Sequence, residues 1–204
     1  MTDRELQAAR RHLKRADRVL RRVIEQVGVY QIRYRDDRFV ALVEAIIAQQ
    51  VSVSAARAVF RRLRDQYPEG LSPRRLMTTT PESLRAVGLS RQKTEYLLGL
   101  ARRVADGTVT LASIDRLDDE QVLKALTQIK GIGRWTVEMF LIFSLRRPDV
   151  LPVHDLGFCK AVQRAYSLRQ PPDPNKIEAL AVPWRPYRSV ATCYLWASLE
   201  PDPW

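Results

Sequence analysis

Cysteine and histidine are scarce in this 204-residue chain, which contains two of each. Two thiols, Cys159 and Cys193, are too few for an all-cysteine zinc site or for a four-cysteine iron–sulfur cluster. We expect both to be small buried residues in a reducing compartment, and the sequence alone leaves a disulfide between them open. The sequence therefore predicts no iron–sulfur cluster.

Long hydrophobic runs are also missing. No stretch has the length and apolar character of a membrane span, and the N-terminal stretch "MTDRELQAARRHLKRADRVL" lacks the apolar centre of a signal peptide. We therefore expect an intracellular protein with no membrane partner, in the cytoplasm or nucleoid if the cell is bacterial or archaeal.

Acidic residues are outnumbered, with 23 Asp and Glu against 34 Lys and Arg, so the formal net charge is +11 at pH 7. Such an excess favours a polyanionic partner, and nucleic acid first, because binding to phosphates releases counterions. The alternative is a basic, solvated surface with no specific partner. The hydrophobic fraction of 46% is enough for a sizeable core.

Alternating strand patterns are absent, and apolar residues recur with the helical period instead. The pattern predicts a charged helix over residues 3–27 and a central buried helix over residues 38–50. Capping and turn residues predict further helix starts, so that about ten helices form an all-α fold. These predicted starts are at Ser52 or Ser54, Thr80-Pro81, Ser90, Asp118, Arg134, Asp155, Asp173-Pro174 and Pro186, the last helix ending near Leu199.

Glycine is infrequent as well, yet two of the eight glycines flank one isoleucine in "LTQIKGIGRWTVEMF" (126–140). Gly131 and Gly133 permit a tight turn with positive φ and a close approach of a ligand to the backbone. The second helix begins near Arg134, so its free N–H groups and its positive dipole end favour a phosphate there. Lys130 and Arg134 add positive charge. The alternative is an ordinary hairpin of two helices that uses glycine only to turn.

A carboxylate stands before another predicted helix, "LGFCKAVQRAY". Asp155 is a natural N-cap for this helix, and the helix N-terminus in turn stabilises its negative charge. A fixed anion can stabilise positive charge that develops during a reaction, and it could also orient or deprotonate a water. His154, beside it, is expected to be only a loop residue, and Trp184 and Tyr187 are expected to pack.

Four motifs in order give the chain a family resemblance. "LTQIKGIGRWTVEMFLIF" resembles the helix-hairpin-helix of the base-excision DNA glycosylase superfamily, and "PDVLPVHDLGFCKAV" resembles its loop ending in a catalytic aspartate. "EAIIAQQVSVSAA" and "PWRPYRSVATCYLW" resemble the 3-methyladenine DNA glycosylase II branch, without the N-terminal β-rich domain that some members carry. The resemblance implies a two-lobed, all-helical fold with a DNA cleft between the lobes. It predicts one domain over residues 1–204, with the hairpin at about 120–144 and the catalytic loop at about 147–156.

The resemblance also implies roles for individual residues. Asp155 is the catalytic aspartate, and Trp135 stands where strand-cutting relatives have a lysine, so water rather than an amine attacks the sugar. An indole also suits a cationic, alkylated purine, because its π-face attracts a cation. The base pocket is then formed by Trp135, Trp196 and Met139. The DNA-binding residues are Gln50, which fills the space of the flipped base, and Lys130, Gly131, Gly133, Arg134 and Thr136.

The function predicted from these residues is a monofunctional glycosylase without lyase activity that flips out and hydrolyses alkylated purines, 3-methyladenine and 7-methylguanine, in base excision repair. Its partner is double-stranded DNA with alkylated bases, and it acts as a monomer. No cofactor is required, and the resemblance implies a structural Na⁺ or K⁺ held by the carbonyls of Thr127, Ile129 and Ile132. The alternatives are a glycosylase for a deaminated or oxidised base and a non-catalytic DNA-binding module.

Overall fold

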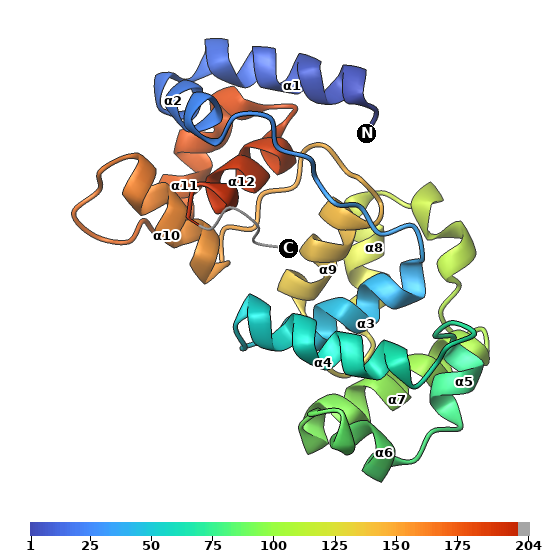
Figure 1. Ribbon diagram of the computed structural model, residues 1–204. Coiled ribbons are helices and arrows are strands. Elements are labelled where there is room, and N and C mark those ends of the chain that lie inside the picture. The colour runs from blue at the N-terminus through green and yellow to red at the C-terminus, as the bar shows by residue number, and fades with distance from the viewer. Residues whose placement is uncertain (200–204) are drawn as a thin grey trace. The chain divides into compact units, whose positions relative to one another are not determined.

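The computed structural model describes residues 1–199, and these residues form helices joined by turns, without a strand (Figure 1). The predicted all-α class is confirmed. The chain divides into two compact units, which are described separately: unit 1 combines Met1–Tyr34 with Arg146–Trp204, and unit 2 is Arg35–Leu145. The predicted domain 1–204 includes residues 200–204, which lie outside the described residues. No helix within residues 1–199 is long and apolar enough to cross a membrane.

Unit 2 is built around α3 (Arg38–Ala48) and α9 (Arg134–Phe143), which pack against each other. Asp37 caps α3 by accepting the N–H of Val40 at 3.0 Å. Seven of the eleven α3 residues are buried, as expected for the predicted central helix. The other helices of unit 2 are α4 (Val53–Asp65), α5 (Pro73–Met77), α6 (Pro81–Ala86), α7 (Arg91–Ala105), the 3₁₀-helix η1 (Leu111–Arg116) and α8 (Asp119–Thr127).

Unit 1 begins with two helices, α1 (Asp3–Ala16) and α2 (Arg18–Val27), so the prediction of a single helix over residues 3–27 is wrong. Asp17 separates them with an extended backbone, φ −145° and ψ 121°. Its carboxylate caps α2 by accepting the N–H groups of Val19 and Leu20. It also accepts hydrogen bonds from the Tyr166 hydroxyl and the Trp184 indole. These tertiary bonds stabilise the break, although the apolar period continues through it.

The rest of unit 1 comes from the C-terminal part of the chain: α10 (Leu156–Ala165), α11 (Pro174–Ala181), the 3₁₀-helix η2 (Val182–Trp184) and α12 (Arg188–Ala197). α12 is buried on most sides and packs against α2 and α10. It begins at Arg188, so the prediction that Pro186 opens it is wrong. Tyr187, with φ −119° and ψ 33°, is not helical and stands before the first turn.

Candidate active site

The hairpin of unit 2 turns at Gly131, which has φ +92° and ends the turn that follows α8. A Cβ placed on Gly131 would lie 2.1 Å from Cγ of Tyr96, whose ring therefore packs against the glycine backbone. Gly133 differs, because its φ of −98° is accessible to any residue. The positive φ predicted for the glycine pair is therefore needed only at Gly131.

The first turn of α9 is open to a ligand. Gly133 occupies its N-cap, no side chain caps the helix, and a Cβ on Gly133 would meet nothing within 4 Å. Lys130 and Arg134 are exposed on either side. Helix N-terminal amides, a partial positive charge and two nearby cations form an arrangement that suits a phosphate.

Thr136, predicted to bind DNA, has a buried side chain with 1% exposure. Its hydroxyl accepts a hydrogen bond from the Gln49 amide at 2.8 Å, and the same amide donates to the Gly131 carbonyl at 2.8 Å. Thr136 could therefore offer DNA only its main chain. Gln50 is exposed and has φ +55°, an unusual conformation for a residue with a side chain.

The carbonyls predicted to hold a monovalent cation belong to Thr127, the last residue of α8, and to Ile129 and Ile132 in the hairpin turn that follows. The Ile129 carbonyl accepts the N–H of Ile132 at 3.0 Å. No group of three or more His, Cys, Asp or Glu within residues 1–199 could hold a metal ion. A carbonyl-bound Na⁺ or K⁺ at Thr127, Ile129 and Ile132 stays a prediction.

Asp155 of unit 1 caps α10, as predicted, by accepting the N–H of Phe158. The same oxygen, Oδ1, accepts a hydrogen bond from the Trp196 indole N–H at 2.9 Å. Trp196 is 5% exposed, and its ring meets Phe158 edge-on. The structure thus places one predicted pocket aromatic as a hydrogen-bond donor to the predicted catalytic carboxylate.

Gly157 makes this approach possible. A Cβ at Gly157 would lie 3.2 Å from Asp155 Oδ1 and 3.6 Å from Trp196 Nε1. A contact of 3.2 Å is tighter than almost all Cβ contacts, so a larger residue would push the carboxylate or the indole away. Gly157 could not be predicted from the sequence, since a glycine early in a helix gives no local signal for this contact.

The loop before Asp155 is tied to the start of α12. Arg188 binds Asp149 through two charge-assisted hydrogen bonds of 2.7 and 2.9 Å. The Ser189 hydroxyl accepts the N–H of Val150 at 2.9 Å and donates to the Arg147 carbonyl at 2.7 Å. The α12 helix therefore holds the loop at Asp149–Val150 and the carboxylate at Asp155. The sequence analysis missed Arg188 and Ser189, although both lie in a quoted motif.

The other pocket residues lie in unit 2. Trp135 is partly buried in the first turn of α9, and Met139 lies one turn later with 3% exposure. The structure thus brings together Asp155 and Trp196 within unit 1. Within unit 2 it brings together the hairpin glycines, Thr136 and the end of α3.

The environments of both thiols raise their pKa and so lower the fraction of thiolate at neutral pH. Burial raises the pKa of Cys193 to about 12. Burial, and to a lesser extent the negative charge of Asp155, raises the pKa of the Cys159 thiol. Cys159 also lies within hydrogen-bond reach of the Val153 carbonyl, at 3.3 Å. Neither cysteine is therefore a candidate for covalent catalysis. His154 is exposed in the loop.

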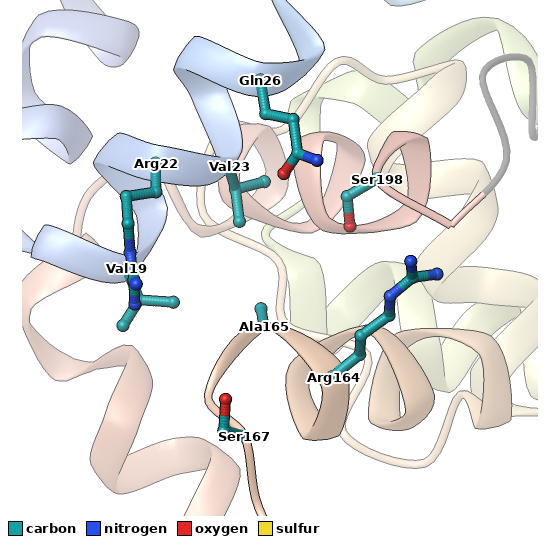
Figure 2. A pocket seen from close by; sticks show the side chains of 8 residues that line it. All are labelled: Val19, Arg22, Val23, Gln26, Arg164, Ala165, Ser167 and Ser198. Carbon is teal, nitrogen blue, oxygen red and sulfur yellow. The ribbon is translucent and has the colours of Figure 1, made fainter.

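Unit 1 also contains a surface pocket formed by α2 and the C-terminal ends of α10 and α12 (Figure 2). Two arginines, Arg22 and Arg164, line it together with the apolar side chains of Val19, Val23 and Ala165. None of the predicted site residues lines it, so it is not the predicted base pocket. Its lining residues are Val19, Arg22, Val23, Gln26, Arg164, Ala165, Ser167 and Ser198.

Comparison with known proteins identifies the family of the chain. Residues 43–186 match the model of the HhH-GPD superfamily base excision DNA repair protein. DNA-3-methyladenine glycosylase 1 of Schizosaccharomyces pombe is 35% identical over 196 residues, covering 91% of this chain and 84% of that protein. DNA-3-methyladenine glycosylase 2 of Escherichia coli is 31% identical, covering 78% of this chain and 57% of that longer protein.

A solved structure agrees with these relatives. The S. pombe 3-methyladenine DNA glycosylase in complex with abasic DNA is 33% identical, and the two folds superpose with a TM-score of 0.87. The match covers 93% of this chain and 95% of that one. The family and the fold inferred from four short motifs are thereby confirmed.

Proposed function

This chain belongs to the HhH-GPD superfamily of base excision DNA repair proteins, in its 3-methyladenine DNA glycosylase branch, and we propose that it hydrolyses alkylated purines from DNA. The observation that carries the proposal is Asp155, fixed at the N-terminus of α10 by the Phe158 amide and the Trp196 indole. The predicted class of enzyme agrees with both glycosylases described above. We propose 3-methyladenine and 7-methylguanine as the substrates.

Asp155 acts on charge that develops during the reaction. As the bond between sugar and base breaks, the sugar acquires oxocarbenium character, and a fixed carboxylate stabilises this cation. The carboxylate can also orient the attacking water or accept its proton. Hydrogen bonds from Phe158 and Trp196 fix its direction before substrate arrives, so little reorganisation is needed during the reaction.

Trp135 supports a monofunctional reaction. It occupies the position at which strand-cutting members of the family use a lysine amine, and an indole cannot form a Schiff base. A purine alkylated at a ring nitrogen, such as 3-methyladenine or 7-methylguanine in DNA, is cationic and already a good leaving group, so it needs no general acid. The aromatic faces proposed for the base pocket attract such a cation. Water is therefore the nucleophile, and the DNA strand stays intact.

The α9 N-terminus supplies the contact with DNA. We propose that its amides, with Lys130 and Arg134, bind a backbone phosphate of double-stranded DNA, a contact that positions the enzyme without reading sequence. Gln50 occupies the space left by the flipped base. We further propose that the protein acts as a monomer inside the cell and needs no cofactor for hydrolysis.

Asp155→Asn tests the proposal. We expect single-turnover release of 3-methyladenine from methylated duplex DNA to fall by roughly a thousandfold, while affinity for DNA with an abasic-site analogue changes little. Asp173→Asn is the matched control, because Asp173 also caps a helix and accepts the N–H of Lys176. This control should keep the wild-type rate.

Three outcomes contradict the proposal in different ways. Near wild-type release by Asp155→Asn would remove Asp155 from the mechanism. Release of a deaminated or oxidised base in place of alkylated purines would change the substrate class. Binding without release of any base by the wild-type protein would leave a non-catalytic DNA-binding module.

A further inference from the structure

Gln49 joins two parts of unit 2 that are far apart in sequence. It is the C-cap of α3, directly after the last helical residue, and its amide donates to the Gly131 carbonyl and to the Thr136 hydroxyl, both at 2.8 Å. Gly131 is the turn of the hairpin, and Thr136 lies in the first turns of α9. One side-chain amide therefore fixes the end of α3 to both sides of the proposed phosphate site.

Lys93 fixes the backbone at the same point. Its ammonium group donates to the carbonyls of Ile47 and Gln49, each at 2.7 Å, and so satisfies carbonyls at the end of α3 that lack helical partners. Burial lowers the pKa of Lys93. The partly buried ammonium group of Lys93 thus fixes the main chain of Gln49 through two hydrogen bonds. The side chain of Gln49 in turn fixes the hairpin.

The hairpin side of this connection is rigid too. The Tyr96 ring packs so closely on Gly131 that a Cβ there would lie 2.1 Å from it, and Gln92 donates to the Tyr96 hydroxyl at 2.6 Å. The Gly131 backbone, whose carbonyl accepts the Gln49 amide, is therefore also in close contact with Tyr96 of α7.

Gln50, the residue after Gln49, has a strained backbone conformation. Its φ of +55° lies in the left-handed region, which costs about 1 kcal/mol for a residue with a Cβ. Its side chain is exposed. Such a conformation persists when the residues around it are held firmly, and Gln49 is the residue that is held.

We propose that Gln49 is a positioning residue that couples the Gln50 turn to the phosphate-binding hairpin. This inference rests on the proposed function, in which Gln50 enters the DNA at the flipped base and the α9 N-terminus binds the backbone. The Gln49 side chain holds the hairpin, and the Gln49 main chain continues directly into Gln50. The position of a bound phosphate therefore determines where Gln50 enters the base stack. Gln49 acts through Gln50 and the hairpin and need not touch DNA.

A double-mutant cycle tests this coupling. The four proteins are wild type, Gln49→Ala, Gln50→Ala and the double variant, all titrated against a duplex in which 2-aminopurine neighbours an abasic-site analogue. Fluorescence then reports base unstacking, and salt is held constant. We expect each single substitution to weaken unstacking about tenfold and the double variant to equal either single one. Multiplying effects, about a hundredfold in the double variant, would overturn the proposal.

Two further variants separate coupling from loss of structure. Thr136→Val is nearly isosteric and removes one of the two acceptors of the Gln49 amide, so it should weaken unstacking in the same direction by less. Gln66→Ala is the matched control: Gln66 also ends a helix, α4, and its amide reaches the Ser83 carbonyl at 3.5 Å. This control should match wild type, and an equal loss there would overturn the proposal.

Failure of the coupling and failure of the proposed function give different results. If wild type releases alkylated bases but the cycle is multiplicative, only the role of Gln49 is wrong. If wild type releases no base, the enzymatic assignment is wrong whatever the cycle gives.

Discussion

Two ten-residue helices, α9 in unit 2 and α10 in unit 1, begin in opposite ways. α9 follows Gly133, and no side chain caps it. α10 follows Asp155, whose carboxylate accepts a hydrogen bond from its first turn. Every helix N-terminus has N–H groups without helical partners and a partial positive charge. α9 offers them to an outside anion, whereas α10 uses them to hold an anion of the protein.

The difference teaches how one electrostatic feature can serve two steps of a reaction. At α9 a missing side chain leaves room for a phosphate, and in the proposed function this helix contributes to DNA binding. At α10 a short acidic side chain occupies the same position, and in the proposed function its carboxylate stabilises positive charge on the sugar. Side chains at the two caps, rather than the helices themselves, decide which task each performs.

Giving α9 the cap of α10 should produce the largest effect on DNA affinity. Gly133→Asp is compatible with the backbone, because φ −98° and ψ 177° are close to those of the Asp118 cap of α8. We expect the folded state to gain only about 0.3 kcal/mol from the new cap, because glycine is itself a tolerable N-cap, while affinity for abasic DNA falls roughly thirtyfold.

Gly133→Asn separates capping from charge in that experiment. It caps the helix as well as Asp does but adds no negative charge, so its loss of affinity should be smaller and the salt dependence of binding should decrease less. Thermal unfolding and binding titrations at two salt concentrations measure both effects. Wild-type affinity in Gly133→Asp would remove the α9 N-terminus from the DNA interface.

Removing the indole donor at α10 should have the next largest effect. Trp196→Phe keeps an aromatic ring beside Phe158 but removes the N–H that binds Asp155. We expect the single-turnover rate to fall about tenfold, with nearly unchanged affinity for abasic DNA, because a less constrained carboxylate stabilises the transition state less well.

Unit 1 provides a matched control for Trp196. Trp184 is buried and donates its indole N–H at 3.0 Å to Asp17, another aspartate N-cap. Trp184→Phe therefore removes the same kind of hydrogen bond from Asp17, an aspartate with no proposed role in catalysis. It should lower stability without a specific loss of rate. Equal rate losses in the two variants would show that general destabilisation, not carboxylate positioning, explains the Trp196 effect.

Asp17→Asn should have the smallest effect, and that effect depends on pH. Burial alone would raise the pKa of Asp17, but hydrogen bonds from Tyr166, Trp184 and two backbone amides lower it overall. Its contribution to stability is therefore complete above the ordinary carboxyl pKa of about 4 and is lost as pH falls through the lowered folded value.

At neutral pH we expect Asp17→Asn to lose about 1 kcal/mol of unfolding free energy, since the carboxylate is only partly buried. The difference from wild type should shrink as pH falls below about 4. Denaturant titrations from pH 7 to pH 3 measure it. A difference that stays constant over that range would show that the charge of Asp17 does not matter.

Local signals explain what the sequence predicted well. Ser52, Asp118, Asp155 and Asp173 all cap the helices expected of them, because a cap and the amide that it binds are only three residues apart. The buried α3 also follows from its own composition. The family was predicted from four motifs in a fixed order, and no single motif would have been specific enough.

Distant partners explain what the sequence missed. The break at Asp17 depends on Tyr166 and Trp184, about 150 residues away, while the local apolar period passes through it without interruption. The hydrogen bond from Trp196 to Asp155 and the contacts of Gln49 also join residues that are far apart in the sequence. A polar pair at the end of an apolar helix was the available signal for Gln49, because a partly buried amide requires hydrogen-bond partners.

The protonated thiols have a consequence for survival of the protein itself. Methylating electrophiles that damage purines react readily with thiolates, which are the strongest nucleophiles among protein side chains. Cys193 has a pKa of about 12, and Cys159 is shifted in the same direction by burial and by its neighbour Asp155. Both shifts lower the fraction of thiolate at neutral pH, and for Cys159 the negative charge of Asp155 contributes to the shift. We therefore expect methylating reagents to modify these two cysteines more slowly than unperturbed thiols.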